Sequence, residues 1–134
     1  MNILVYGMTD NPGGVESVVM NYYRNITKEN YNFIFLTHSK TIAYENEILQ
    51  RGDKVIKIPP RKKCIFKYNK LIKSIFESEK IDVVWANTCS LSNITCLKFA
   101  KRFGVKTRII HSHNSKNMGS KITQILHLIN KRKI

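Results

Sequence analysis

Residues 3–16 read ILVYGMTDNPGGVE and join an apolar run, through a glycine-containing loop, to the start of a helix. The run over residues 3–6 has the length and composition of a strand buried on both faces. From Val15 onward, apolar residues return at helical spacing and form one stripe. The segment therefore predicts a strand–loop–helix unit. The members of its helical stripe are Val15, Val18, Val19, Tyr22, Tyr23 and Ile26.

The same alternation of apolar run and helical stripe continues along the chain. Further strands are predicted at residues 33–36, 55–58, 81–85 and 108–110. Helices are predicted at about residues 43–51, 61–76 and 91–103, and one more begins at about residue 122. Strands that are apolar on both faces and separated by helices predict an α/β fold with a doubly wound parallel sheet of the Rossmann type.

Sheets of this type bind ligands beyond the carboxyl ends of their strands, where loops meet the amino termini of helices. The residues expected to carry function are therefore in four loops, at positions 7–14, 37–40, 87–90 and 111–119.

Length and composition predict one soluble, cytoplasmic domain. The chain has 134 residues and is 43% hydrophobic, which suits a single folded domain and excludes wholesale disorder. No apolar run approaches the roughly 18–20 residues of a membrane-spanning helix, and the first residues lack the pattern of a signal peptide. Three cysteines indicate neither a disulfide framework nor a zinc ribbon. The formal charge of +14 favours polyanionic partners.

The first loop places Gly13 and Gly14 at the start of a helix, where backbone amides can approach a phosphate. The glycine pair is equally suited to a tight turn. The loop has no G-x-G-x-x-G pattern, and no acid follows the second strand, which disfavours a dinucleotide and hence a nucleotide-binding oxidoreductase. No Gly-Lys-Ser/Thr follows the glycines, which excludes a Walker P-loop.

The fourth and fifth loops are rich in groups that form hydrogen bonds. His111 and His113 are two apart and could form half of a metal site, but no further ligands are evident and we expect no metal. One histidine packing while the other faces a polar ligand is the favoured interpretation, and a structural role for both stays open. Residues 87–90, Asn-Thr-Cys-Ser, suit a sugar ligand, whereas Ser90 or Ser92 also suits a helix cap.

A basic cluster precedes and enters the third predicted helix. Arg61, Lys62 and Lys63 are expected to begin it, and Lys63, Lys67 and Lys70 then form a row opposite its apolar stripe. Such a row is commonly a solvated surface. The density of basic residues over positions 61–73, with Phe66 nearby, favours docking on an anionic membrane, and no nucleic-acid-binding motif is present.

Two elements together resemble the amino-terminal domain of glycosyltransferase family 4, whose members are retaining enzymes built from two Rossmann domains (the GT-B architecture). They are Pro-Gly-Gly-Val-Glu, ending at Glu16, and His-Ser-His-Asn-Ser, starting at His111. The resemblance implies that Gly13 and Gly14 lie against the donor diphosphate and that His113 lies beside the transferring sugar as the catalytic residue. It further implies that Glu16 faces the acceptor side of the cleft and that Asn114 and Ser115 form the rest of the His113 loop. With Asn87 of the fourth loop, these are the candidate residues for binding the acceptor or a sugar.

The implied activity is transfer of a sugar, hexosyltransferase-like and with retention, from a nucleotide sugar to a cell-surface polysaccharide or lipid-linked acceptor. No metal or other cofactor is implied. The family's second, donor-binding domain is absent from these residues, so residues 1–134 are expected to be one domain, incomplete at its carboxyl end and inactive alone. The implied location is peripheral, on the inner face of the plasma membrane. The alternative is a non-catalytic basic module that docks on anionic membrane or nucleic acid.

Overall fold

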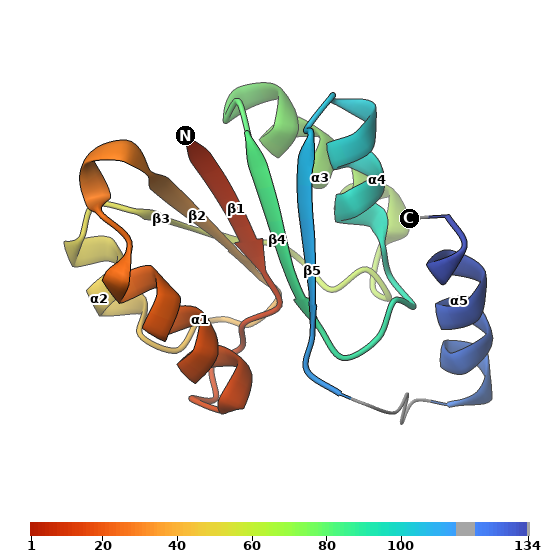
Figure 1. Cartoon of the computed structure of the whole chain (residues 1–134). Coiled ribbons are helices and arrows are strands. Elements are labelled where there is room, and N and C mark those ends of the chain that lie inside the picture. Colours follow the sequence, from red (N-terminus) through yellow and green to blue (C-terminus); the bar gives the residue numbers. More distant parts are fainter. Residues whose placement is uncertain (115–119, 134) are drawn as a thin grey trace.

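A computed structural model describes residues 1–114 and 120–133. Its five strands form one parallel sheet in the order β3-β2-β1-β4-β5 (Figure 1). This order confirms the predicted α/β fold with a doubly wound, Rossmann-like sheet. The strands are β1 (Asn2–Tyr6), β2 (Asn32–Thr37), β3 (Lys54–Lys57), β4 (Val83–Thr88) and β5 (Thr107–Ser112).

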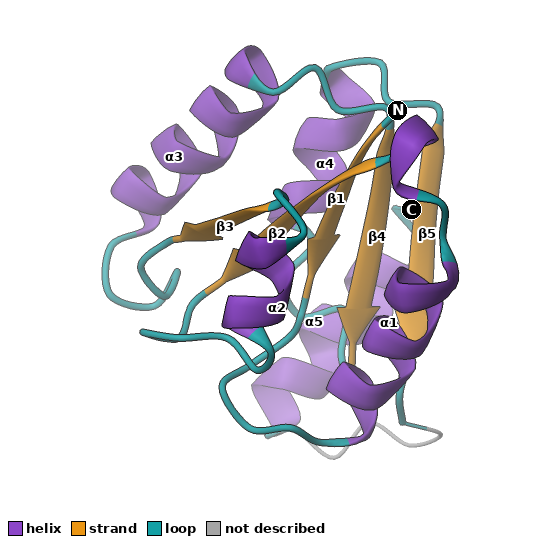
Figure 2. Cartoon of the chain, turned by 90° about the vertical axis from the view of Figure 1, so that its left-hand side faces the viewer, coloured by secondary structure: helices purple, strands orange, loops and turns teal. Residues whose placement is uncertain are grey.

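Helices cover both faces of the sheet. α1 (Gly14–Asn25) and α2 (Glu45–Gln50) lie on one face, and α3 (Ile65–Ser78) and α4 (Thr95–Arg102) lie on the other (Figure 1, Figure 2). A short 3₁₀ turn, η1 (Lys28–Asn30), precedes β2, and α5 (Lys121–Lys131) ends the described chain. The crossovers therefore bring the carboxyl ends of β1, β4 and β5 together at one edge of the molecule.

Alternating residues of the strands supply two separate cores. In β1, Leu4 packs in the cluster under α3 and α4, whereas Ile3 and Val5 pack in the cluster under α1 and α2. Leu4 and Val5 are both almost fully buried, which is why this run is apolar at every position rather than at every second one.

Two predicted helix starts are wrong by about four residues. Residues 91–94 form a turn before α4, because the Asn93 side chain accepts a hydrogen bond from the Thr95 N–H, and neither Ser90 nor Ser92 caps the helix. The basic residues 61–63 form a turn before α3, closed by the bond from the Lys63 N–H to the Pro60 carbonyl. Lys63 therefore lies outside the helical row of Lys67 and Lys70.

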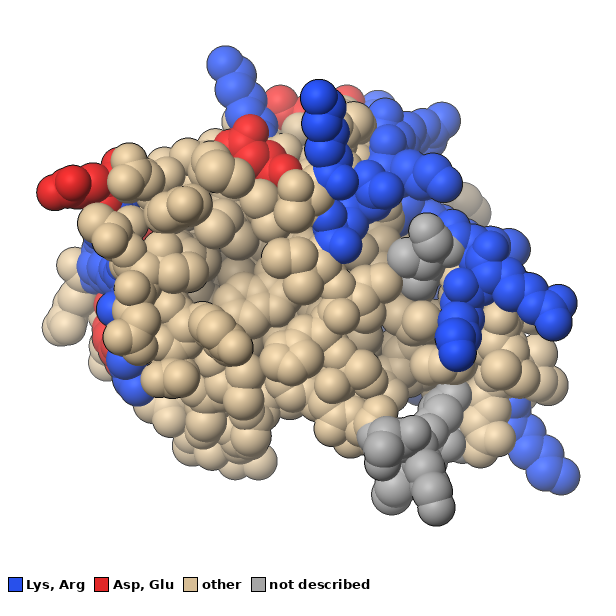
Figure 3. All heavy atoms as spheres, in the orientation of Figure 1, with Lys and Arg blue, Asp and Glu red and all other residues tan. Residues whose placement is uncertain are grey.

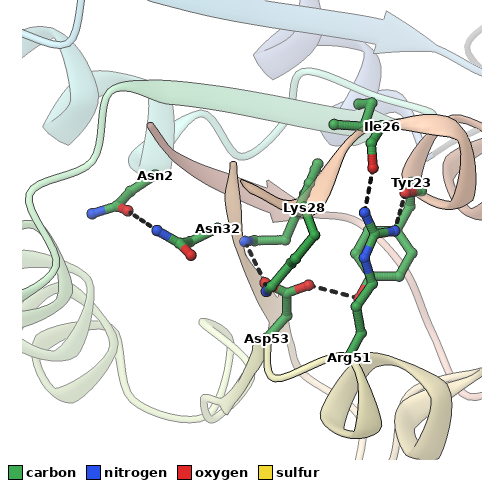
Figure 4. A network of polar contacts seen from close by, with 8 residues as sticks. Asn2, Tyr23, Ile26, Lys28, Asn32, Arg51 and Asp53 are labelled. Carbon is green, nitrogen blue, oxygen red and sulfur yellow. Dashed lines mark hydrogen bonds and ion pairs between the residues drawn. The ribbon is translucent and has the colours of Figure 1, made fainter. Parts of the chain in front are cut away.

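A buried carboxylate stabilises the other end of the sheet, where β2 and β3 begin (Figure 4). Asp53 accepts hydrogen bonds from the Tyr23 hydroxyl at 2.7 Å, the Phe33 N–H at 2.8 Å and the Lys28 ammonium. Arg51 stacks on the Tyr23 ring, with its Cζ 4.3 Å from the ring centroid, and donates to the carbonyls that end α1. This network joins the end of α1 to the turn between α2 and β3.

Candidate functional site

The ends of β1, β2 and β4 enclose a cavity of about 370 Å³. Among the described residues, its lining contains no lysine, arginine or carboxylate, and most of its polar groups are hydroxyls and amides. Such groups both donate and accept, as the hydroxyls of a sugar also do. The polar residues that line it are Thr9, Thr37, His38, Ser39, Tyr68, Asn87, Thr88, Ser90, Ser92 and Asn93.

Tyr68 and Asn93 are residues of this cavity that the sequence analysis missed. Tyr68 belongs to the apolar stripe of α3, but its hydroxyl accepts a bond from Asn93 Nδ2 at 3.2 Å, and its ring lies 5.6 Å from that of His38. The sequence did carry one signal for Tyr68, its hydroxyl group, because a buried tyrosine needs a polar partner.

The glycine loop lies beside the cavity, with α1 beginning at Gly14. The Gly13 N–H is already bonded to the Asn11 carbonyl at 2.8 Å and to Glu16 Oε2 at 3.1 Å. A Cβ added to Gly14 would meet nothing within 4 Å, so the backbone there is open to a close approach. Among the described residues none accepts from the Gly14 N–H, which makes this amide the better placed of the two for an anion.

The Glu16 side chain accepts hydrogen bonds from the glycine loop and stabilises its conformation. Its Oε1 accepts from the Thr9 N–H at 2.8 Å and from the Thr9 hydroxyl at 3.0 Å, while Oε2 accepts from Gly13. Burial opposes ionisation of this carboxyl, but the hydrogen bonds from Thr9 and Gly13 outweigh burial and lower its pKa. The spacing from Gly13 to Glu16 is that of a capping box. The sugar-binding role of Glu16 stays a prediction, and its contacts show that both oxygens are engaged.

We expect Glu16→Gln to destabilise the chain by about 1.5–3 kcal/mol at neutral pH, because the amide nitrogen would face another donor. The lowered pKa means that the folded chain binds this proton more weakly than the unfolded chain. The stabilisation is therefore complete above the ordinary pKa of 4.5 and is lost as pH falls through the lower value in the folded chain. Urea unfolding at neutral and acidic pH should show the difference shrinking in acid. The exposed Glu77→Gln provides the control, and an equal difference at both pH values would contradict this account.

His113 lies at the end of β5 with its ring bonded to Asn87. Its Nε2 is 3.1 Å from Asn87 Oδ1, and its ring centroid is 4.3 Å from that of His111. Burial and the neighbouring His111 lower the pKa of His113, while the Glu16 carboxylate acts in the opposite direction. The imidazole is therefore neutral at physiological pH. Asn114 is exposed beside it, and Ser115 lies outside the described residues.

The basic cluster borders a second, larger groove of about 980 Å³. Arg61 is half-buried, with an Nε that has no partner among the described residues, whereas Lys62, Lys63, Lys67 and Lys70 are exposed. The exposed Phe66 and residues Ile122 and Leu126 of α5 line the same groove. The groove shares His38, Ser92 and Asn93 with the cavity, so the two hollows are contiguous.

The sequence analysis also missed a second concentration of positive charge. Residues 83–134 contain no acidic residue at all, whereas the nine acidic residues of the chain all precede them. Lys and Arg accordingly gather on the right-hand side of Figure 3, where Figure 1 places α4 and α5. The basic residues of this stretch are Lys98, Lys101, Arg102, Lys106, Arg108, Lys116, Lys121, Lys131, Arg132 and Lys133.

The described residues contain neither a helix that could cross a membrane nor a cluster of metal ligands. None of the helices there has both the length and the apolar character needed to span a bilayer. Within residues 1–114 and 120–133, no three His, Cys, Asp or Glu side chains gather as a metal site would require.

The chain is similar in sequence to one curated protein and in fold to several solved structures. It is 32% identical over 108 residues to the "Putative glycosyltransferase EpsF" of Bacillus subtilis strain 168, a match that covers 78% of this chain and 28% of that protein. No protein-family model matches the chain.

MurG of Acinetobacter baumannii superimposes with a TM-score of 0.64 at 13% identity, covering 96% of this chain and 38% of MurG. The carboxyl-terminal domain of the PF1911 hydrogenase from Pyrococcus furiosus superimposes with a TM-score of 0.58 at 16% identity, covering 81% of this chain and 89% of that domain. At these identities the structural likenesses show the fold alone. The chain thus shares its fold with both proteins and, by sequence, corresponds to about a quarter of the length of EpsF.

Proposed function

We propose that the chain is the acceptor-side, amino-terminal domain of a retaining glycosyltransferase of the GT-B architecture. It would move a sugar from a nucleotide sugar to a cell-surface polysaccharide or lipid-linked acceptor. The observation that carries the proposal is the uncharged, hydroxyl-rich cavity beside an open helix terminus, at the edge where ligands bind in this fold. The similarity to EpsF supports it, and the same similarity disfavours a non-catalytic basic module.

In this proposal each feature of the site has one chemical task. The Gly14 amide and the amino terminus of α1 stabilise negative charge as it develops on the leaving diphosphate. The neutral His113 orients the donor sugar through a hydrogen bond, with Asn114 and Ser115 completing its loop. The acceptor occupies the cavity next to Asn87, and the reaction requires no metal ion.

The nucleotide would bind to a second domain, as a continuation of the chain or as a partner subunit. Under this two-domain arrangement the cavity is left to the acceptor. The proposal therefore concerns the acceptor and the sugar–diphosphate junction only.

The test is His113→Ala in the complete enzyme that contains this domain. We expect turnover of a nucleotide sugar to fall at least about 100-fold with folding unchanged, because an orienting group in the site is lost. Transfer of radiolabelled sugar to membrane acceptors measures it. The matched control is a substitution of His127, which lies on α5 outside the cavity and should retain activity. Unchanged turnover in His113→Ala would remove this residue from the site.

We also propose that the exposed basic cluster docks the enzyme on an anionic membrane. Lys62 and Lys63 line the larger groove together with Phe66, which is 85% exposed, and the exposed Lys67 follows Phe66 in the chain. Basic residues near an anionic surface contribute about 1 kcal/mol each, so reversing three lysines to glutamate should weaken binding at least about 100-fold. Co-sedimentation with phosphatidylglycerol-containing vesicles measures this binding. Reversing Lys101, Arg102 and Lys106 makes the same charge change elsewhere, and an equal loss in both variants would show that net charge alone governs binding.

A further inference from the structure

We propose that Asn87 is a positioning residue for His113: its side-chain carbonyl holds the imidazole in the tautomer protonated on Nε2 and leaves Nδ1 as a hydrogen-bond acceptor. The nature of the ligand, a sugar hydroxyl, rests on the proposed function. The tautomer is a property of the chain by itself and can be tested without any ligand.

Asn87 is held in place beside the imidazole ring. The residue is 2% exposed and lies near the end of β4. The peptide of Asn87 lies against Gly7 so closely that a Cβ on Gly7 would be 1.7 Å from the Asn87 carbonyl oxygen. On the other side, the His113 N–H donates to the Thr88 carbonyl at 3.3 Å. Backbone contacts on both sides therefore fix the distance between the amide and the imidazole.

The contact between Asn87 and His113 determines which ring nitrogen carries the proton. A carbonyl oxygen only accepts, so the imidazole nitrogen that faces Asn87 Oδ1 at 3.1 Å must carry the proton. Since the pKa of His113 is lowered, the ring holds one proton rather than two. The titratable groups that act on it are His111 on β5 and Glu16 on α1. Nδ1 then has a free lone pair, and no residue within 1–114 and 120–133 bonds to it.

The amide nitrogen of Asn87 is available to a ligand. Asn87 Nδ2 is buried with no hydrogen-bond partner among the described residues, and Asn87 lines the uncharged cavity. An unpaired buried donor costs about 1–3 kcal/mol, a penalty that an incoming oxygen would remove. The pair therefore presents one donor, Asn87 Nδ2, and one acceptor, His113 Nδ1.

This combination selects the chemical class of group that can bind. Hydroxyls both donate and accept, so one hydroxyl can accept from Asn87 Nδ2 and another can donate to His113 Nδ1, whereas a phosphate or carboxylate oxygen only accepts and would meet the Nδ1 lone pair unfavourably. Under the proposed function, sugar hydroxyls would therefore bind at His113 and phosphate at the start of α1.

The decisive measurement is the tautomer of His113 in the unmodified chain. Long-range ¹H–¹⁵N spectra of histidine-labelled protein at about pH 8, above the ordinary pKa, distinguish a protonated ring nitrogen from an unprotonated one. The signals of His113 are identified by their absence in His113→Gln. We expect the proton on Nε2. A proton on Nδ1 would overturn the proposal, because Asn87 would then be donating through Nδ2.

Two variants test whether Asn87 is the cause. Asn87→Asp keeps the acceptor and adds a negative charge, so His113 should retain its tautomer while its titration midpoint rises by about one pH unit. Asn87→Leu removes the acceptor and should give mixed tautomers. Asn93→Asp adds the same charge to the cavity wall without contacting His113, since Asn93 bonds Tyr68. If the titration midpoint of His113 in Asn87→Asp were no higher than in Asn93→Asp, the proposal would be overturned.

These outcomes are independent of the proposed transfer activity. The spectra require no nucleotide, acceptor or second domain, and a variant that fails to fold still leaves the tautomer of the unmodified chain as the deciding result. Conversely, the expected tautomer could be found while the enzyme transfers no sugar. In that case the positioning role of Asn87 would stand, and only the sugar hydroxyl as its ligand would be refuted.

Discussion

Gly7→Ala should destabilise the chain by at least about 4 kcal/mol and leave much of it unfolded, since domains of this size are stable by only about 5–15 kcal/mol. Gly7 has a φ of +109°, which residues with a side chain rarely adopt, and its added Cβ would be 1.7 Å from the carbonyl oxygen of Asn87. That oxygen belongs to the backbone of a central strand. It cannot rotate away, so the ends of β1 and β4 would have to separate.

Substitutions at two other glycines separate the energetic cost of backbone strain from the cost of a steric clash with the added Cβ. Gly104 has a φ of +75° with nothing within 4 Å of an added Cβ, so Gly104→Ala should cost only about 1–2 kcal/mol. Gly14 has neither constraint, and Gly14→Ala should leave the chain as stable as before or stabilise it by up to about 1 kcal/mol. Urea unfolding of the three variants measures the series. If Gly7→Ala lost no more than Gly104→Ala, the close approach of β1 to Asn87 would be refuted.

The architecture could be predicted from the sequence because the central strands β1, β2 and β4 are largely apolar on both faces. Leu4 and Val5, adjacent in the chain, are buried in opposite cores, and this requires helices on both sides of a parallel sheet. Helix starts were less predictable, because they depend on local polar contacts. The Asn93 side chain makes α4 begin later than predicted, and the turn after Pro60 does the same for α3. The apolar periodicity of both segments nevertheless continues through these residues.

The candidate site was predictable as a set of loops but not as a set of contacts. The strand ends identified the region of Gly14 and His113, since the fold determines where ligands bind. The hydrogen bond between His113 and Asn87 depends on the register of β4 and β5, in which Asn87 is opposite His111 rather than His113. Register in a parallel pair is determined by packing of the whole sheet, and no local pattern in the sequence specifies it.

Asp53→Ala should cost about 3–5 kcal/mol, the largest loss expected from a substitution far from the cavity. The Asp53 side chain is fully buried and is the acceptor for three donors. Lys28 is 37% exposed and can regain water, but the Tyr23 hydroxyl and the Phe33 N–H are buried and cannot. Burial and the adjacent carboxylate both raise the pKa of Tyr23, so its hydroxyl remains a donor throughout the accessible pH range.

A comparison with a surface ion pair tests whether burial is the cause. Arg24 and Glu47 form a close pair whose side chains are 49% and 40% exposed, so Glu47→Ala should cost less than about 1 kcal/mol. Tyr23→Phe removes one of the three donors to Asp53 and should have an intermediate effect. Free energies of unfolding in urea, with the Tyr23→Phe/Asp53→Ala double variant, complete the thermodynamic cycle. Because the two residues share one hydrogen bond, the double variant should lose less than the sum of the single losses. Strict additivity of the two losses would show that Tyr23 and Asp53 stabilise the fold independently. If Asp53→Ala lost no more stability than Glu47→Ala, the buried network would contribute no more than a solvated ion pair.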